Sequence, residues 1–213
     1  MKKIIYSPGE PSGIGPDLII QLSCSTFWNQ INIPIACIAD PELLIDRANT
    51  LGKKIKIKEI SNPVELKKNK RNEIQVIKIA KCPNTKYGKL HRSNAKYVLD
   101  NLNYGIDTAL TNKKVGLVTG PISKENIISI DKKFSGHTEH IQKLTKSKDV
   151  LMLLGSEKLK VALATTHIPL KAVPKKITKS LIINKAIILN EELKNKFRIK
   201  NPQITLLGLN PHA

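Results

Sequence analysis

The chain has 213 residues, 40% of them hydrophobic, and a formal net charge of +19. This length and hydrophobic content predict one sizeable folded core and exclude a fibrous or disordered protein. Only four of the 36 basic residues are arginine and aromatic residues make up 4% of the chain, which disfavours a nucleic-acid reader built on arginine forks and aromatic stacking.

Strand-like and helix-like segments alternate along the chain, which predicts an α/β fold with helices covering a parallel or mixed sheet. Helical spacing of apolar residues predicts amphipathic helices over residues 91–110 and 177–196. The lysine-rich stretch 53–71 is expected at the periphery, because its charges interrupt any core face. The predicted strands are residues 3–7, 35–39, 56–60, 74–79, 115–119, 150–154, 159–166 and 203–209.

Cysteine usage and hydropathy indicate where such a chain works. Cys24, Cys37 and Cys82 are an odd number without C-x-x-C spacing, which favours a reducing cytoplasm over a disulfide framework or a zinc knuckle. No apolar run reaches the length of a membrane span, and the first apolar stretch is too short for a signal peptide. We expect a soluble cytoplasmic protein with no membrane partner. Residues 1–213 are expected to form a single α/β unit without an internal boundary.

Two turns rich in glycine and proline follow predicted strands. Residues 7–17 lead into a helix with Pro16 and Asp17 in its first turn, and their three glycines let backbone N–H groups approach an anion closely. The spacing is not the dinucleotide fingerprint, and such a turn needs no ligand. Residues 115–124 end on Lys124, which can pair with a phosphate or carboxylate but is equally compatible with a solvated lysine.

Residues 134–140 place two histidines at the start of a predicted helix. His137 lies at the N-terminal end, where backbone donors and the helix dipole favour an anion. Thr138 is expected to cap the helix. His137 and His140 are three residues apart, so they can share a helix face as metal ligands.

Two further histidines stand at the ends of predicted strands. His167 follows the run 159–166 and His212 follows the run 203–209. Groups at the carboxyl ends of parallel strands point into a common crevice, so these two imidazoles are candidate ligands of one metal ion. A catalytic site would need a third protein ligand and an open position.

Five motifs follow one another along the whole chain. They are PGEPSGIGPD at 8–17, TGP at 119–121 with Lys124, GHTE at 136–139, LATTHIPL at 163–170 and GLNPHA at 208–213. Together, in this order, they resemble one family: the chain is similar to 4-hydroxythreonine-4-phosphate dehydrogenases of vitamin B6 biosynthesis. The resemblance implies a three-layer α/β/α fold like that of isocitrate and isopropylmalate dehydrogenases, incomplete at the C-terminus because family members continue past the last motif.

The activity implied by this resemblance is NAD-dependent, or NADP-dependent, oxidation of 4-phosphooxy-L-threonine. The product then loses CO2 to give 3-amino-2-oxopropyl phosphate, a precursor of pyridoxal 5'-phosphate. The resemblance also implies a divalent metal (zinc, magnesium or cobalt) and a homodimer with active sites at its interface. It implies no nucleic-acid partner.

The resemblance assigns roles to five positions. His167 and His212 match metal-binding histidines, and His137 and Thr138 match substrate-binding residues. Lys124 is a candidate catalytic residue, and no NAD contacts are assigned. The family's third metal histidine and a neighbouring aspartate lie beyond the matched segment.

Three interpretations follow from these assignments. The first is a metal- and NAD-dependent dehydrogenase, of which this chain is a fragment, a frame-disrupted product, or one piece that a second polypeptide completes. The second is a catalytically inactive truncated remnant that at most binds a phosphorylated ligand. The third, which the composition disfavours, is a basic nucleic-acid-binding domain, whose binding would depend steeply on salt.

Overall fold

The computed structural model describes residues 2–84 and 86–211, which fall into two compact units. The N-terminal unit is Met1–Lys146 and the C-terminal unit is Ser147–Ala213. The sequence predicts no boundary at this point. Each unit is described by itself, because their relative positions are not determined.

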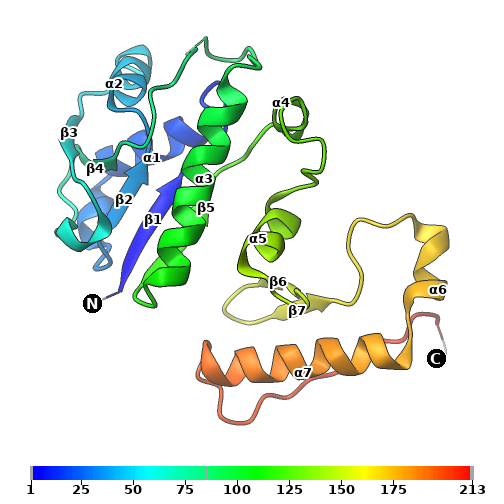
Figure 1. Ribbon diagram of the computed structural model, residues 1–213. Coiled ribbons are helices and arrows are strands. Elements are labelled where there is room, and N and C mark those ends of the chain that lie inside the picture. Colours follow the sequence, from blue (N-terminus) through cyan, green and yellow to red (C-terminus); the bar gives the residue numbers. More distant parts are fainter. Residues whose placement is uncertain (1, 85, 212–213) are drawn as a thin grey trace. The chain divides into compact units, whose positions relative to one another are not determined.

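A five-stranded parallel sheet forms the centre of the N-terminal unit (Figure 1). Its strand order is β3-β4-β2-β1-β5, so β1 lies between β2 and β5, and the lysine-containing β3 is at one edge. The five strands predicted in this unit are confirmed to within two residues at each end. Their bounds are β1 Lys3–Ser7, β2 Ile35–Ile38, β3 Lys56–Glu59, β4 Glu73–Ile77 and β5 Val115–Thr119.

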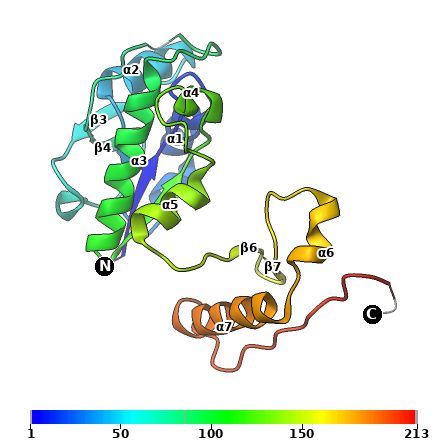
Figure 2. The same ribbon diagram turned by 45° about the vertical axis from the view of Figure 1, so that its right-hand side comes forward.

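Helices cover both faces of this sheet, which confirms the predicted three-layer α/β/α architecture (Figures 1 and 2). Helices α1 (Gly15–Cys24) and α2 (Pro41–Thr50) pack on one face, together with buried Trp28 from the short helix η1 (Thr26–Gln30). Helix α3 (Asn94–Thr111) packs on the other face, as its apolar periodicity predicts. A further short helix is η2 (Pro63–Glu65).

The first glycine-rich turn leads into α1 as predicted. Pro16 and Asp17 lie in the first turn of α1, where proline is compatible with the missing intrahelical donor. The Asp17 carboxylate accepts two hydrogen bonds from the Arg47 guanidinium on α2, one of them Nη2 to Oδ2 at 2.7 Å. This bidentate ion pair joins the two helices on that face of the sheet.

The loops after β1 and β5, residues 8–14 and 120–123, are interlocked by close backbone contacts. β1 and β5 pair in register up to Ser7 and Thr119, so both loops begin at the same edge of the sheet. Gly120 donates its N–H to the Ser7 carbonyl at 2.7 Å, and Glu10 donates its N–H to the Pro121 carbonyl at 2.9 Å. We call residues 8–14 and 120–123 the interlocked loops.

Glycine is required where the interlocked loops touch. A Cβ atom at Gly9 would lie 2.1 Å from the Pro121 carbonyl oxygen, and one at Gly120 would lie 2.2 Å from the Pro8 carbonyl oxygen. At Gly15, which begins α1, the distance to the Pro8 oxygen would be 1.8 Å. Close packing of backbone therefore accounts for these glycines without any bound ligand.

Two short helices follow the β5 loop and lie near α3 (Figure 2). Helix α4 spans Lys124–Ile128 and helix α5 spans His137–Thr145. They bring the candidate residues Lys124, His137 and Thr138 into the N-terminal unit.

The C-terminal unit consists of an antiparallel hairpin and helices (Figure 1). The hairpin pairs β6 (Met152–Gly155) with β7 (Lys160–Leu163). Helix α7 (Lys179–Asn195) matches the predicted helix 177–196 closely and is preceded by η3 (Leu170–Ala172) and α6 (Val173–Lys176). Across the described residues 2–84 and 86–211, no helix has the length and hydropathy that crossing a membrane requires.

The prediction of a strand over residues 203–209 is wrong. The segment is irregular, and it lines a groove of about 590 Å³ together with the β6–β7 hairpin and α7. A strand needs a neighbouring strand to satisfy its backbone donors and acceptors, and none of the described strands pairs with this segment. Its leucines are largely exposed, with Leu207 at 88%.

The backbone contact at Gly15 yields a stability prediction. We expect Gly15→Ala to lower the free energy of unfolding by about 3 kcal/mol, because the new methyl group collides with rigid backbone. Gly116→Ala is the matched control, because its Cβ would meet nothing closer than 4.0 Å. Urea unfolding followed by fluorescence of Trp28, the chain's one tryptophan, measures both. Equal stability of the two variants would contradict the close packing of Pro8 against the start of α1.

Candidate functional site

The candidate site is centred on the N-terminal end of α5. Gly136 is the N-cap residue and makes no side-chain cap hydrogen bond, and His137 is the first residue of the helix. The prediction that Thr138 caps the helix is therefore wrong, because Thr138 lies inside the first turn. The prediction that His137 occupies the N-terminal end is confirmed.

Lys124 lies beside this helix end. It is the first residue of α4, and its amine is so close to Gly136 that a Cβ atom there would lie 3.5 Å from Nζ. Among residues 2–84 and 86–211, no carboxylate oxygen lies within ion-pairing distance of the Lys124 amine. The amine therefore has no ion-pair partner among the described residues and can bind an anion. We call Lys124, His137 and the first turn of α5 the anion site.

Burial and neighbouring positive charge keep His137 neutral at pH 7. Burial is the main cause that lowers the pKa of His137, followed by the charges of His140 and Lys124. A neutral imidazole both donates and accepts hydrogen bonds, so His137 contributes a donor while Lys124 contributes the charge.

His140 connects α5 to α3 instead of forming a metal site with His137. Its Nε2 atom is 2.7 Å from the Asn103 carboxamide oxygen, and its ring packs on Phe134 with centroids 5.2 Å apart. Burial lowers the pKa of His140, with Lys143 acting in the same direction and Asp131 against it. His140 is therefore explained by the packing of α5 on α3, and His137 by its place in the anion site.

The two predicted metal ligands belong to a different part of the chain. His167 is an exposed residue of the C-terminal unit with a positive φ of 54°, and β7 ends four residues earlier, at Leu163. The prediction that a parallel strand delivers His167 is wrong, because β7 pairs only with β6 and runs antiparallel to it. His212 lies outside the described residues. Within the described part of the chain, no three metal-ligating side chains gather into a possible metal site.

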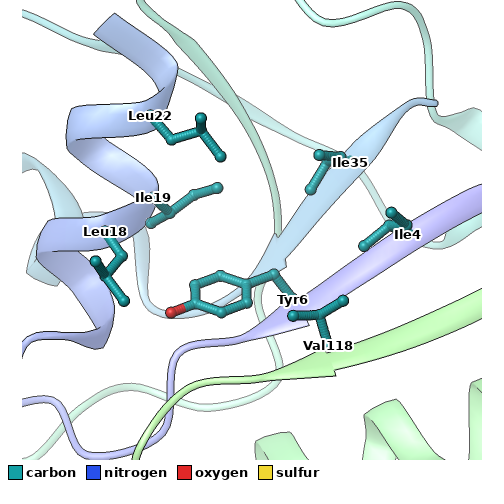
Figure 3. Close-up of a pocket in the computed structure, with 7 residues that line it drawn as sticks. All are labelled: Ile4, Tyr6, Leu18, Ile19, Leu22, Ile35 and Val118. Carbon is teal, nitrogen blue, oxygen red and sulfur yellow. The ribbon is translucent and has the colours of Figure 1, made fainter. Parts of the chain in front are cut away.

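An apolar pocket of about 190 Å³ in the N-terminal unit lies apart from these residues. It is formed between α1 and the strands β1, β2 and β5 (Figure 3). Its one polar group, the Tyr6 hydroxyl, donates to the Gly15 carbonyl at 3.0 Å, and burial raises the pKa of Tyr6 to about 12. The pocket thus offers no charge or free donor to a phosphorylated ligand. Its lining residues are Ile4, Tyr6, Leu18, Ile19, Leu22, Ile35 and Val118.

Two residues near the anion site carry no sequence signal of their own. Glu10 is a buried carboxylate in the interlocked loops, and Asn126 is a buried residue of α4. Glutamate in a polar turn is ordinarily exposed, so its burial follows only from the tertiary contact of the two loops.

The chain matches one family profile over most of its length. The profile of "Pyridoxal phosphate biosynthetic protein PdxA" matches residues 30–213. A 4-hydroxythreonine-4-phosphate dehydrogenase from Pseudoalteromonas translucida is 37% identical over 211 residues, which are 99% of this chain and 63% of the relative. The enzyme of the same name from Citrobacter koseri is 37% identical over 213 residues, covering 100% of this chain and 64% of the relative. The chain thus spans less than two thirds of the length of these relatives.

Solved structures share the fold. A 4-hydroxythreonine-4-phosphate dehydrogenase from Burkholderia phymatum aligns with a TM-score of 0.86 and 24% identity, over 100% of this chain and 64% of that chain. A terephthalate 1,2-cis-dihydrodiol dehydrogenase from Burkholderia xenovorans aligns with a TM-score of 0.63 and 18% identity, over 99% of this chain and 62% of that chain. These likenesses confirm the predicted dehydrogenase-type α/β/α fold.

The lowered pKa values of His137 and His140 make stability depend on pH. Below the ordinary value of 6.5 the unfolded chain binds more protons than the folded one, so stability is full above pH 6.5 and falls as the pH is lowered through it. The fall ends below the depressed pKa values of the folded state. We expect the double variant His137→Asn/His140→Asn to flatten this dependence, measured as the urea midpoint from Trp28 fluorescence. Thr138→Ala, without a titratable group, should keep the wild-type slope, and an unchanged slope in the double variant would refute the assignment.

Proposed function

The chain belongs to the pyridoxal phosphate biosynthetic protein PdxA family, and on that premise we propose that it serves the NAD-dependent oxidation of 4-phosphooxy-L-threonine. Decarboxylation then yields 3-amino-2-oxopropyl phosphate, a precursor of pyridoxal 5'-phosphate. The observation that carries this proposal is the unpaired Lys124 amine beside the start of α5. The names of the relatives supply the phosphorylated threonine derivative as the substrate.

The anion site suits a phosphate ester through three kinds of donor. The Lys124 ammonium supplies charge, the His137 imidazole supplies a neutral donor, and the first turn of α5 supplies backbone N–H groups that no helical carbonyl uses. Thr138, in the same turn, adds a hydroxyl group. We assign His137 and Thr138 to substrate binding, and we assign to Lys124 the orientation of the substrate through its anionic group.

Glu139 moderates the affinity of this site for anions. A Cβ atom at Gly136 would lie 3.0 Å from the Glu139 Oε2 atom, so a carboxylate borders the same helix end as the Lys124 amine. A negative charge in the first turn stabilises the helix but repels a bound phosphate. Because His137 is neutral, the Glu139 charge offsets that of Lys124, and we expect the anion to be bound through the placement of the donors.

The cofactors are proposals at the level of the family. NAD or NADP would accept the hydride, and we assign no residue to it. His167 and His212 are our proposed ligands for a zinc, magnesium or cobalt ion. The described residues do not form a metal site by themselves, so we assign no step of the reaction to a metal.

Location and assembly are proposed on similar grounds. We place the protein in the cytoplasm, which the free thiols of Cys24, Cys37 and Cys82 support. A homodimer with its active site at the interface stays a prediction from the resemblance. The alternative function, binding of a phosphorylated ligand without catalysis, uses the same anion site and is separated from the first by an activity assay.

Replacing Lys124 or Glu139 should move phosphate affinity in opposite directions. We expect Lys124→Met to weaken binding of inorganic phosphate by about tenfold or more, because a charge-assisted hydrogen bond is lost. Glu139→Gln should strengthen it about threefold, because a repulsive charge is removed. Titration calorimetry measures both, and Lys132→Met on a neighbouring exposed residue is the control. Equal affinities of Lys124→Met and wild type would exclude the proposed site.

Catalysis should require the portion of the family's chain that this one does not match. We expect the 213-residue chain alone to form little NADH from 4-phosphooxy-L-threonine, and to gain activity when produced together with the unmatched C-terminal part of the Pseudoalteromonas relative. In that complex His167→Ala should lower bound zinc more than it lowers helix content seen by circular dichroism. Unchanged zinc in the variant would count against His167 as a ligand, and full activity of the chain alone would contradict the first expectation.

A further inference from the structure

The buried carboxylate of Glu10 is hydrogen-bonded to the helix that carries Lys124 and has no ion-pair partner among the described residues. Glu10 is 5% exposed, and its two oxygens accept hydrogen bonds from the Ser12 N–H at 3.3 Å and from the Asn126 Nδ2 atom at 3.1 Å. No described lysine or arginine nitrogen is within ion-pairing distance of it. Burying a carboxyl group is costly unless it is hydrogen-bonded, and these two bonds give each oxygen of Glu10 a donor.

Asn126 connects this carboxylate to the helix that carries Lys124. It lies two residues after Lys124 in α4, and its Nδ2 atom also donates to the His91 carbonyl at 3.3 Å. Both acceptors require the NH2 group of Asn126, so Glu10 and the His91 carbonyl together fix the orientation of this side chain.

Helix α4 depends on such contacts for its position. It has five residues, too few to be stable as an isolated helix, and only Asn126 and Ile127 in it are buried. The Ser123 hydroxyl caps it by accepting from the Asn126 N–H at 3.2 Å. The direction in which α4 presents Lys124 is therefore set by the packing of Ile127 and by the polar bonds of Asn126.

We propose that Glu10 is a positioning residue for the anion site: through Asn126 it holds α4 so that the Lys124 amine lies beside the N-terminal end of α5. This inference rests on the proposed function, because it assumes that Lys124 binds the anionic group of the substrate. It gives the glycine-rich motif at 8–17 a role in binding without any contact to the ligand. The carboxylate itself matters, because its two oxygens each accept from a different donor. A glutamine at position 10 has one acceptor oxygen, so its NH2 group would face either Asn126 or the Ser12 N–H, both of which are donors.

The test is a double-mutant cycle on phosphate affinity. Dissociation constants for inorganic phosphate are measured for the wild-type chain, Glu10→Gln, Lys124→Met and the double variant. We expect Glu10→Gln to weaken binding about fivefold when Lys124 is present and to have no further effect in the Lys124→Met background, because the two residues act through one interaction. Asp40→Asn is the matched control: Asp40 is another buried carboxylate, which accepts from the Cys82 N–H at 2.8 Å and has no bond to α4.

A second measurement separates positioning from a general loss of structure. Lys124 contributes to the lowered pKa of His137, so the pKa of His137 measured by NMR should rise in Glu10→Gln and in Lys124→Met, and should stay unchanged in Asp40→Asn. Trp28 fluorescence reports whether each variant is folded. Equal weakening by Glu10→Gln in both backgrounds, or an unshifted His137, would overturn the positioning role while the anion site stands. Undiminished binding in Lys124→Met would instead remove the anion site, and the role of Glu10 with it.

Discussion

The contact between the two interlocked loops is the constraint on which the site depends. At this edge of the sheet the backbone of residues 8–9 touches that of residues 120–121 so closely that no Cβ atom fits at Gly9 or Gly120. Hydrogen bonds from Gly120 to Ser7 and from Glu10 to Pro121 join the loops directly. Helix α4 follows the second loop directly, so the contact of that loop with the first loop also determines where α4 begins. A motif that looks like a ligand cradle in the sequence is, in the folded chain, a rigid backbone support.

The chemistry of the anion site follows from what this support leaves unpaired. Lys124 has no carboxylate partner among the described side chains. The buried carboxylate of Glu10, which accepts a hydrogen bond from Asn126 of the same helix, has no cation partner among them. Asn126, two residues after Lys124 in α4, connects the helix to Glu10 through its hydrogen bond to that carboxylate. Burial lowers the pKa of His137 and keeps it neutral, so its imidazole can donate a hydrogen bond to an anion without forming an ion pair with Glu139. The proposed anion site therefore depends on the placement of its donors, because the Glu139 charge offsets that of Lys124.

Sequence reasoning succeeded where local pattern and tertiary structure agree. Apart from the lysine-containing β3, the strands of the N-terminal unit are short, mostly apolar runs between glycine, proline and polar turns. Each of the five strands pairs with a parallel neighbour, so their prediction is confirmed. Residues 203–209 have the same pattern but no neighbouring strand, and periodicity cannot reveal whether a partner exists. Thr138 has the chemistry of a cap, yet Gly136 occupies that position, because a helix end can shift by two residues without any change in pattern. The burial of Glu10 and Asn126 could not be predicted from the sequence for a further reason. It arises from a contact between two residues that are 116 positions apart in the chain.

The two units differ in how much of their chemistry they can carry alone. The N-terminal unit has clusters of buried side chains on both faces of its sheet, and every residue of the anion site and of its support lies within it. In the C-terminal unit, Leu193 is the one buried residue among those described, and apolar side chains such as Leu170 and Leu207 are largely exposed. Apolar surface of this kind marks an incomplete core or an interface. The proposed anion site thus lies in the well-packed unit. The proposed metal ligand His167 lies in the unit with little buried apolar surface among the described residues, so less packing surrounds it than surrounds the anion site.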